Sequence, residues 1–446
     1  MSGSFDTVFS GATVVTPSGR EEADIGVVDG RIAAIGALSG AVASETIDCR
    51  GLHILPGVID SQVHFREPGL EHKEDLESGA RAAVLGGVTG VFEMPNTSPN
   101  TTSTATLADK VARATGRMSC DFAFWVGATA ENIDALPALE RLPGSAGIKI
   151  FMGSSTGTLL VEDDETLDQV MRAISRRCAV HAEDEPRLRS RKDLRVEGDP
   201  TSHPVWRDPE AALMATRRLV GAARRAGRRV HVLHISTADE MDYLVDHKDV
   251  ATLEVTPNHL TLAVDEDSAR LGSLMQMNPP VRDASHRERI WAAIRDGLVD
   301  VLGSDHAPHT LDEKAAPYPN SPSGMPGVQT LVPVMLDHVA NGRLSLERFV
   351  DLTSAGPQRI FGIVRKGRIA LGYDADFTIV DLKRRETITN DWIATKAGWS
   401  PYDGMTVTGW PVGTIVRGIR VMWQGELVSP GQGAPIAFLE ALQPAE

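Results

Sequence analysis

Lys149, His181, His234 and Asp305 belong to the residue types that can build a site for a divalent metal ion. Imidazole and carboxylate groups contributed by separate segments are common ligands of Zn²⁺ and similar ions. A lone buried histidine is more often a hydrogen-bonded core residue. Here, however, the two histidines end consecutive apolar runs, and the aspartate follows a later one. This combination predicts a metal site.

Lys149 lies within an apolar run, between Ile148 and Ile150. Side chains alternate between the two faces of a β-strand, so the isoleucines point one way and the lysine the other. If the isoleucines face surrounding helices, Lys149 faces the interior, where an unpaired ammonium group is costly. A lysine that reaches solvent is the alternative, but the histidines and the aspartate favour the interior position.

These residues lie in or just after short apolar runs, most of them followed by a polar connection and a helical stretch. This alternation is typical of βα units. Eight runs predict a closed (β/α)₈ TIM barrel rather than an open sheet, and catalytic groups in such barrels lie where the strands end. The runs cover residues 57–60, 88–94, 122–126, 147–152, 179–181, 229–235, 252–256 and 299–303.

The two ends of the sequence differ from this middle part. They carry short β-type runs separated by Gly and Asp, and Asp29-Gly30 between two such runs indicates a β-hairpin. We therefore expect a barrel domain of residues 56–365 and a second, discontinuous β-rich domain of residues 1–55 and 366–446.

Composition argues against several classes of protein. The 446 residues include 45 Lys+Arg against 60 Asp+Glu, a net charge of -15, which disfavours a nucleic-acid binder. The arginines between residues 217 and 229 are interpreted as the solvated face of a helix.

Cys49, Cys120 and Cys178 are too few for a disulfide framework or a thiolate metal site. Without a signal peptide or a run of ~18 apolar residues, the protein is expected to be cytoplasmic and not membrane-bound.

Ten short motifs, in order along nearly the whole chain, resemble the dihydroorotase branch of the amidohydrolase superfamily. The resemblance implies a metal-dependent cyclic amidohydrolase on a (β/α)₈ barrel, with the two β-rich ends forming a small β-sandwich domain. The motifs are PGVID (56–60), VHFREPG (63–69), KED (73–75), GGVT (86–89), MPNT (94–97), IKIFM (148–152), VHAED (180–184), HIST (234–237), NPPVR (278–282) and SDHAPH (304–309).

The resemblance also implies roles for the metal-binding residues. Lys149 would react with CO₂ to give N6-carboxylysine, an anionic ligand that bridges two metal ions, with Zn²⁺ expected. His181 and His234 would bind the more exposed ion, and His64 and Asp305 the more buried one. Asp305 would also be the catalytic base, taking a proton from the bridging hydroxide and delivering it to the leaving amide nitrogen.

The sequence departs from the family pattern at Gln62, where the family has the first histidine of a His-x-His pair that ends here in His64. An amide oxygen is a weaker ligand of a Zn²⁺-type ion than imidazole. Three outcomes stay open: two ions with a weakened buried site, one ion held by Lys149, His181 and His234, or no productive metal.

The substrate-binding positions of the family correspond to Arg66, Asn96 and His309, and Asn278 is expected to make backbone contacts near the substrate ring. A guanidinium, an amide and an imidazole together suit a carboxylate. Hydantoinases and allantoinases tend not to have this arginine. The implied reaction therefore interconverts dihydroorotate and N-carbamoyl-aspartate in pyrimidine biosynthesis.

Alternatives remain for the binding residue and for the function. Arg66 could instead pair with Glu67 or Glu71 at the surface. A related enzyme of allantoinase or hydantoinase type would keep the metal site and open another cyclic ureide or imide. A non-catalytic homologue would serve as a scaffold for an aspartate transcarbamoylase. Only the presence of Gln62 in place of a ligand histidine supports this alternative. Dimers are common in the family, so a homodimer or larger homo-oligomer is expected.

Overall fold

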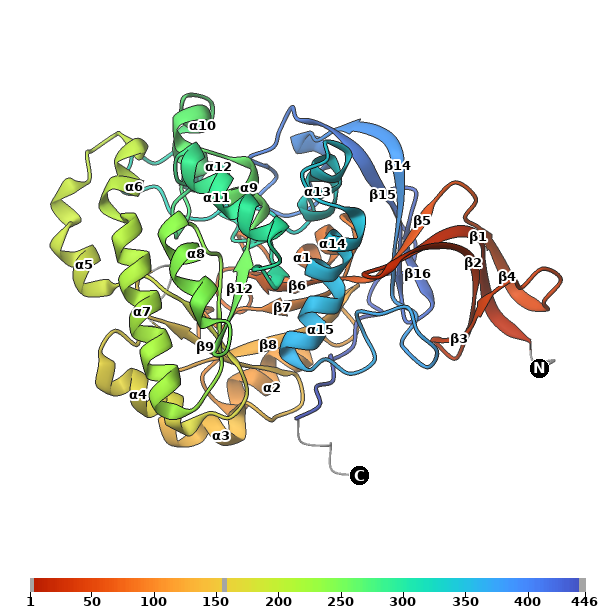
Figure 1. Ribbon diagram of the computed structural model, residues 1–446, viewed down its shortest axis with the longest axis horizontal. Coiled ribbons are helices and arrows are strands. Elements are labelled where there is room, and N and C mark those ends of the chain that lie inside the picture. The colour runs from red at the N-terminus through yellow and green to blue at the C-terminus, as the bar shows by residue number, and fades with distance from the viewer. Residues whose placement is uncertain (1–3, 155–158, 441–446) are drawn as a thin grey trace.

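An eight-stranded parallel sheet forms the centre of the molecule (Figure 1). The computed structural model describes residues 4–154 and 159–440. The strands follow one another in chain order, and a parallel bridge between Val63 and His306 joins the first strand to the segment after the last. The predicted barrel is therefore confirmed. Its strands are β6 (Val58–Val63), β7 (Val88–Glu93), β8 (Asp121–Gly127), β9 (Ser145–Phe151), β10 (Cys178–His181), β11 (Val230–Val232), β12 (Ala251–Val255) and β13 (Val301–Leu302).

Helices between the strands surround the barrel (Figure 1). Several begin at a side chain that accepts a hydrogen bond from the first turn, as Asp75, Asp163 and Asp208 do. Short helices follow the strand ends: α5 (Glu185–Ser190), α6 (His203–Trp206), α9 (Pro257–Thr261), α10 (Val264–Leu271) and α12 (Leu311–Lys314). The others are α1 (Leu76–Leu85), α2 (Thr104–Ala114), α3 (Leu136–Leu139), α4 (Asp164–Ala173), α7 (Pro209–Ala226), α8 (Ala238–Leu244), α11 (Ala284–Arg295), α13 (Leu331–Ala340), α14 (Leu346–Val350) and α15 (Gly356–Phe361).

Helix α7 shows how the sequence pattern determines packing. Its apolar residues recur at helical spacing and are buried, including Leu219 and Ala223. The helix ends at Gly227, whose φ of 63° lies in the left-handed region that glycine adopts readily. Its arginines form ion pairs with aspartates of neighbouring segments: Arg218 with Asp164, Arg224 with Asp249 and Arg225 with Asp168.

A second, mostly antiparallel sheet of nine strands is built from both ends of the chain (Figure 1). The expected hairpin at Asp29-Gly30 is confirmed, because it connects β2 and β3, which pair antiparallel. The two chain ends meet where β5 pairs antiparallel with β14. The strands are β1 (Phe5–Thr16), β2 (Gly19–Val28), β3 (Arg31–Gly36), β4 (Ala43–Asp48), β5 (His53–Pro56), β14 (Phe377–Thr387), β15 (Thr406–Val416), β16 (Ile419–Trp423) and β17 (Glu426–Leu427).

The segment after β17 returns to the barrel. Pro435 forms a parallel bridge with Phe122 at the start of β8, and Ile436 and Phe438 are buried in one apolar cluster with barrel residues that include Ile59 and Ala123. This segment closes the end of the barrel at which the strands begin. The division at residues 55/56 and 365/366 stays a prediction, since part of 366–446 packs against the barrel.

The cysteines and the helices bear on the remaining expectations from composition. All three cysteines are buried and free. Within the described residues, no helix is both long enough and apolar enough to cross a bilayer.

Candidate active site

The ends of the barrel strands bring most of the expected site residues into one pocket. Parallel strands all end on the same side of the barrel, so residues far apart in sequence meet there. After β11 and β13 the chain changes direction at residues with a positive φ, His234 (37°) and Asp305 (49°). The expected residues that line the pocket are Gln62, His64, Lys149, His181, His234, Asn278 and Asp305.

Lys149 lies in the barrel interior and its residue is only 1% exposed. Its Nζ lies 4.4 Å from the ring centre of Phe151, and it forms no hydrogen bond or ion pair with any described residue. Burial lowers the pKa of this lysine to about 7, although Asp305 and Glu254 act in the opposite direction. A large fraction of the amine is therefore neutral at pH 7, which is the form that reacts with CO₂.

The two central histidines contact each other. His181 Nδ1 lies 3.0 Å from His234 Nε2, and His181 Nε2 lies 2.9 Å from Glu183 Oε2. Burial lowers the pKa of both rings, so they are neutral, as metal ligands must be. Nδ1 of His234 is buried without a hydrogen-bond partner.

Gln62, His64 and Asp305 form the opposite wall of the pocket. Gln62 Nε2 donates to Asp305 Oδ1 at 2.9 Å, and His64 Nε2 lies 3.4 Å from the same oxygen. The Gln62 Oε1 atom is buried without a hydrogen-bond partner. Burial raises the pKa of Asp305 to about 6, and the nearby cation-forming groups His181 and Lys149 oppose this shift.

The donor set fits a divalent ion, although the side chains are not arranged around a common centre. Among the described residues, no three His, Cys, Asp or Glu side chains are grouped closely enough to hold a metal. Two buried atoms of the pocket, Gln62 Oε1 and His234 Nδ1, lack hydrogen-bond partners. Burying polar groups without partners is unfavourable. Together with the neutral imidazoles and the buried Lys149 amine, these atoms are suited to a cation and its ligands.

The residues expected to bind a carboxylate lie beside the pocket. Arg66 is 2% exposed, and its Nη2 lies 3.3 Å from His309 Nε2. Asn96 Oδ1 lies 2.7 Å from His64 Nδ1, and Asn278 Oδ1 lies 2.9 Å from His203 Nε2. Among the described residues, Asn278 lines the pocket itself, whereas Arg66, Asn96 and His309 do not.

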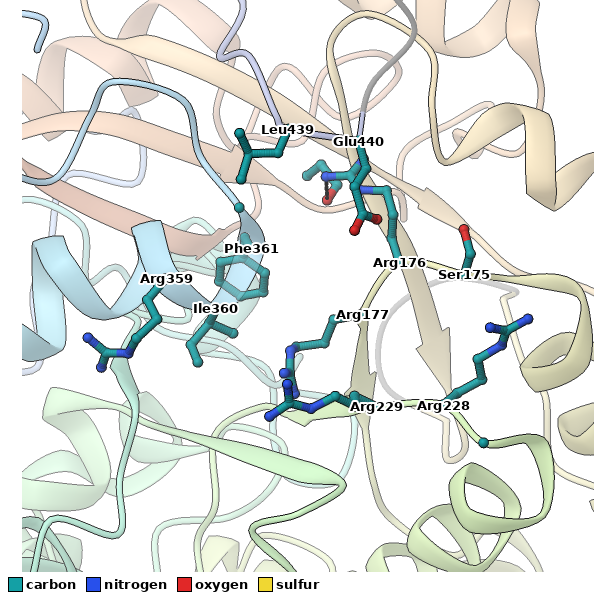
Figure 2. Close-up of a pocket in the computed structure, with 13 residues that line it drawn as sticks. Ser175, Arg176, Arg177, Arg228, Arg229, Arg359, Ile360, Phe361, Leu439 and Glu440 are labelled. Carbon is teal, nitrogen blue, oxygen red and sulfur yellow. Dashed lines mark hydrogen bonds between the residues drawn. The ribbon is translucent and has the colours of Figure 1, made fainter. Parts of the chain in front are cut away.

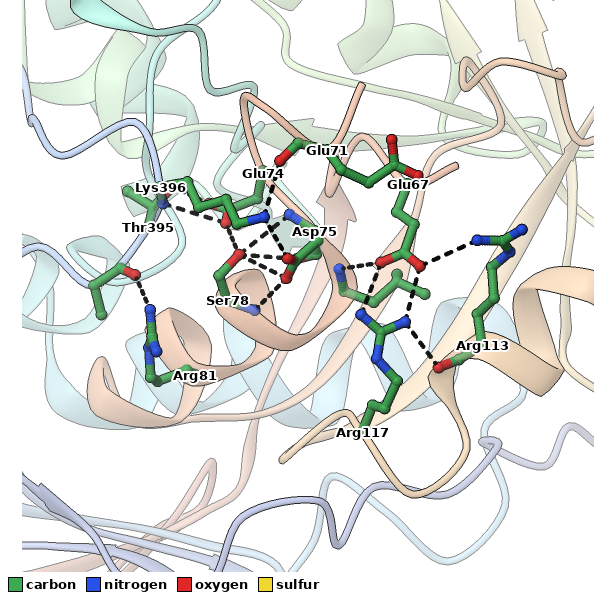
Figure 3. A network of polar contacts seen from close by, with 12 residues as sticks. Glu67, Glu71, Glu74, Asp75, Ser78, Arg81, Arg113, Arg117, Thr395 and Lys396 are labelled. Carbon is green, nitrogen blue, oxygen red and sulfur yellow. Dashed lines mark hydrogen bonds and ion pairs between the residues drawn. The ribbon is translucent and has the colours of Figure 1, made fainter. Parts of the chain in front are cut away.

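Arg66 does not pair with the neighbouring glutamates. Glu67 instead accepts hydrogen bonds from Arg113 and Arg117 (Figure 3), and Glu71 accepts one from the backbone of Gly69. Arg66 Nε donates to the Pro308 carbonyl at 3.2 Å. The guanidinium is thus held at the first strand end by groups on the loop after the last strand.

A polar network connects the loop between β6 and α1 to the segment between β14 and β15 (Figure 3). The buried carboxylate of Glu74 accepts hydrogen bonds from Ser78 and from Thr395, and Lys396 forms an ion pair with Asp75 at 2.5 Å. The contacts connect the start of α1 to residues far along the chain. They fix the loop that carries Arg66.

Sequence reasoning missed several buried charged residues around the pocket. Glu254 in β12 accepts a hydrogen bond from Ser61 at 2.7 Å, and burial raises its pKa to about 8. Glu183 pairs with the buried Arg207, which holds the carboxylate next to His181. Glu183 follows His181 by two residues, a spacing that could have indicated this partner. Arg207 carries no local signal.

Comparisons with known proteins show which family the chain belongs to. A model of the amidohydrolase family matches residues 53–421. A dihydroorotase of Halobacterium salinarum is 39% identical over 414 residues, covering 92% of this chain and 95% of that protein. An L-hydantoinase of Paenarthrobacter aurescens is 35% identical, covering 96% of this chain and 97% of that protein. The solved L-hydantoinase (dihydropyrimidinase) of Arthrobacter aurescens has a TM-score of 0.93 at 32% identity, covering 97% of this chain and 99% of that one.

Proposed function

Because the chain belongs to the amidohydrolase family and is a hydrolase of cyclic amides, we propose that its substrate is dihydroorotate, which it interconverts with N-carbamoyl-aspartate. The observation that carries this choice is the buried Arg66 guanidinium beside His309 at the first strand end. A guanidinium in this position suits a ring that bears a carboxylate. Asn96 and the backbone at Asn278 complete the proposed substrate contacts.

Amidohydrolases of this kind are generally metal-dependent. We propose Zn²⁺ as the ion, with Lys149 carboxylated and His181 and His234 as ligands of one ion. His64 and Asp305 would hold a second ion, with Gln62 as a weak additional ligand. When bound, the metal supplies Lewis-acid chemistry at the amide carbonyl.

We propose that Asp305 transfers a proton from the attacking water to the ring nitrogen of the substrate. With a pKa of about 6, its carboxylate is mostly ionised at pH 7 and can accept a proton on an oxygen. Delivery of that proton to the ring nitrogen makes the nitrogen a better leaving group. The Gln62 amide and the His64 ring, both beside Oδ1, hold the carboxylate in position.

Substrate profiling tests the choice of substrate. We expect kcat/KM for dihydroorotate to exceed that for dihydrouracil, hydantoin and allantoin by at least a hundredfold, measured with the metal-loaded enzyme. Comparable rates on the rings without a carboxylate would contradict the assignment. Metal analysis and mass spectrometry of Lys149 in the same preparation test the proposed metal site.

A hydantoinase activity is the second candidate, because the solved L-hydantoinase has the same overall fold with a TM-score of 0.93. Turnover of hydantoin with little turnover of dihydroorotate would identify it. A non-catalytic scaffold would turn over neither ring and would bind no metal.

We further propose that the protein is cytoplasmic and forms a homodimer or larger homo-oligomer, with an aspartate transcarbamoylase as a candidate partner. Light scattering on the purified chain gives the oligomeric state. Co-purification with a transcarbamoylase from the same source tests the partner.

A further inference from the structure

A second pocket lies at the opposite end of the barrel from the candidate active site. It has a volume of about 410 Å³ and is formed by segments that precede β10 and β11, by the end of α15 and by the end of the described chain (Figure 2). The pocket is large enough for a small-molecule ligand. It shares no lining residue with the active-site pocket.

The lining of this pocket is strongly basic. Five arginines line it, and Glu440 is the one acidic residue of the described lining. The protein as a whole has a net charge of -15, so the pocket reverses the sign of the overall charge. Figure 2 shows the guanidinium groups of Arg177 and Arg229 next to one another. The five residues are Arg176, Arg177, Arg228, Arg229 and Arg359.

One of these arginines has a structural role. Arg176 donates to the backbone carbonyls of Glu140, Ser145 and Ala146, and its guanidinium lies 4.7 Å from the ring centre of Phe438. Arg176 therefore holds the closing segment of the chain against the barrel and has little capacity for a ligand.

The other four arginines keep unused donors. Arg177 uses Nη1 for Val230 and Thr252, but its Nε is buried without a partner, as is Nε of Arg228. Arg229 forms no hydrogen bond or ion pair with a described residue. Arg359 forms a single ion pair with Asp351 at 3.2 Å.

Neighbouring guanidinium groups repel one another unless an anion lies between them. Burial and the nearby Arg229 lower the pKa of Arg177 to about 10, which is consistent with such repulsion. Several N–H donors converging on one pocket suit an anion with many oxygen atoms, and arginine binds phosphate oxygens in a bidentate manner.

The opposite wall of the pocket is apolar. Ile360, Phe361 and Leu439 line it, and Leu439 is 74% exposed. An organic group attached to a phosphate chain could cover this exposed side chain.

We propose that this pocket binds an oligophosphate anion, either the phosphate chain of a nucleotide or an inorganic polyphosphate. The charge of the pocket, its unused guanidinium donors and its volume all fit this class of ligand. The site is separate from the proposed hydrolytic site, and binding there does not require turnover.

Calorimetric titration of the metal-loaded protein with ATP and with tripolyphosphate, at low ionic strength, tests the proposal. The variant Arg229→Gln/Arg359→Gln removes two exposed charges of the pocket without altering the carbonyl contacts of Arg176 and Arg177. We expect its affinity for both probes to fall at least tenfold. The control Arg50→Gln/Arg385→Gln removes two exposed arginines far from the pocket, one between β4 and β5 and one in β14, and should keep the parent affinity.

Chelation at the metal centre contributes equally to all three proteins, so the difference between them reports on the pocket alone. Tighter binding of ATP than of tripolyphosphate would identify a nucleotide, and equal binding a polyphosphate chain; either supports the site. No saturable binding of either probe up to 1 mM, or equal affinities for the parent and the pocket variant, would overturn it.

Discussion

Gln62 is the residue proposed as a weak ligand of the second, more buried metal ion. Its Nε2 donates to Asp305, and its Oε1 is buried without a partner. Because imidazole is a stronger ligand than an amide oxygen, Gln62→His is expected to raise the metal content per chain and to increase kcat several-fold. Elemental analysis and steady-state kinetics on the same preparations measure both.

The matched variant Gln62→Ala should bind no more than one ion. A gain of metal in Gln62→His without a gain in rate would indicate a one-metal mechanism. No change in either quantity would show that residue 62 does not reach the ion.

Arg66 is expected to hold the substrate carboxylate, and its side chain is almost fully buried. Truncation by Arg66→Ala should lower kcat/KM for dihydroorotate by ~2–4 kcal/mol of transition-state stabilisation, roughly 30- to 800-fold. Arg113→Ala, which removes an arginine on the outer side of the same network, is the control and should stay near the parent value. An Arg66→Ala enzyme with parent kinetics would disprove the role.

At this scale the sequence is informative where a residue type is unusual for its position. Lys149 between two isoleucines is such a case, and the structure places it in the barrel interior. Glu254 and Arg207 could not be assigned, because their importance depends on tertiary partners, Ser61 and Glu183, that lie elsewhere in the chain.

At the scale of elements, two glycines of α7 have opposite expected effects on stability. Gly227 ends the helix with a φ of 63°, so Gly227→Ala should lower the free energy of unfolding by about 1 kcal/mol. Gly221 lies within the helix, and an added Cβ would meet only the flexible end of Arg225. Gly221→Ala should therefore raise the free energy of unfolding by about 0.5–1 kcal/mol. Urea unfolding measures both, and shifts of the same sign would contradict this account.

Glu67 connects the loop after β6 to helix α2 and the residues that follow it. Burial alone would raise its pKa, but hydrogen bonds from Arg117 and the Leu76 backbone lower it below the ordinary 4.5. The ionised carboxylate therefore stabilises the fold above pH 4.5, and this contribution is lost as the pH falls through the lowered pKa.

Glu67→Gln should therefore cost about 1 kcal/mol at pH 7, since Arg117 is partly exposed. The difference from the parent should shrink as the pH is lowered below 4.5, as measured by urea unfolding at several pH values. The exposed Glu77→Gln is the control. A difference that is constant with pH would argue against the charge interaction.

The eight barrel strands could be predicted because each contains a short run of mainly apolar residues, but their lengths could not. The run at residues 229–235 forms a strand only over Val230–Val232, and the run at 299–303 only over Val301–Leu302. Both strands stop before the residues that turn with positive φ, His234 and Asp305. The apolar run continues beyond the last strand residue in each case because the residues that follow the strand are also buried.

For the molecule as a whole, the segment Pro435–Phe438 closes the end of the barrel at which the strands begin. Phe438 is 4% exposed and packs at 5.5 Å from the ring of Phe92. Phe438→Ala should lower the free energy of unfolding by about 3 kcal/mol, measured by denaturant unfolding. Leu439→Ala is the control and should have little effect, because that side chain is exposed. Equal losses in the two variants would show that the closure contributes no packing energy.

This closure could not be predicted from the sequence. The four residues from Pro435 to Phe438 are too few to show a period, and their pairing partners lie in two distant segments, Phe122 in β8 and Ile363 after α15. The association of the two chain ends was expected from their shared β-type pattern and from the family resemblance, but neither indicated which strands pair.

The pairing of β5 with β14 has a consequence for synthesis of the chain on the ribosome. Pro56 pairs with Phe377, so the N-terminal strands are made roughly 320 residues before their partner. At translation rates of ~5–20 residues per second, the delay is about 15 to 60 seconds. During that time the edge of β5 that later pairs with β14 is exposed and can pair with other nascent chains. The risk of aggregation is therefore greatest before the second sheet is complete.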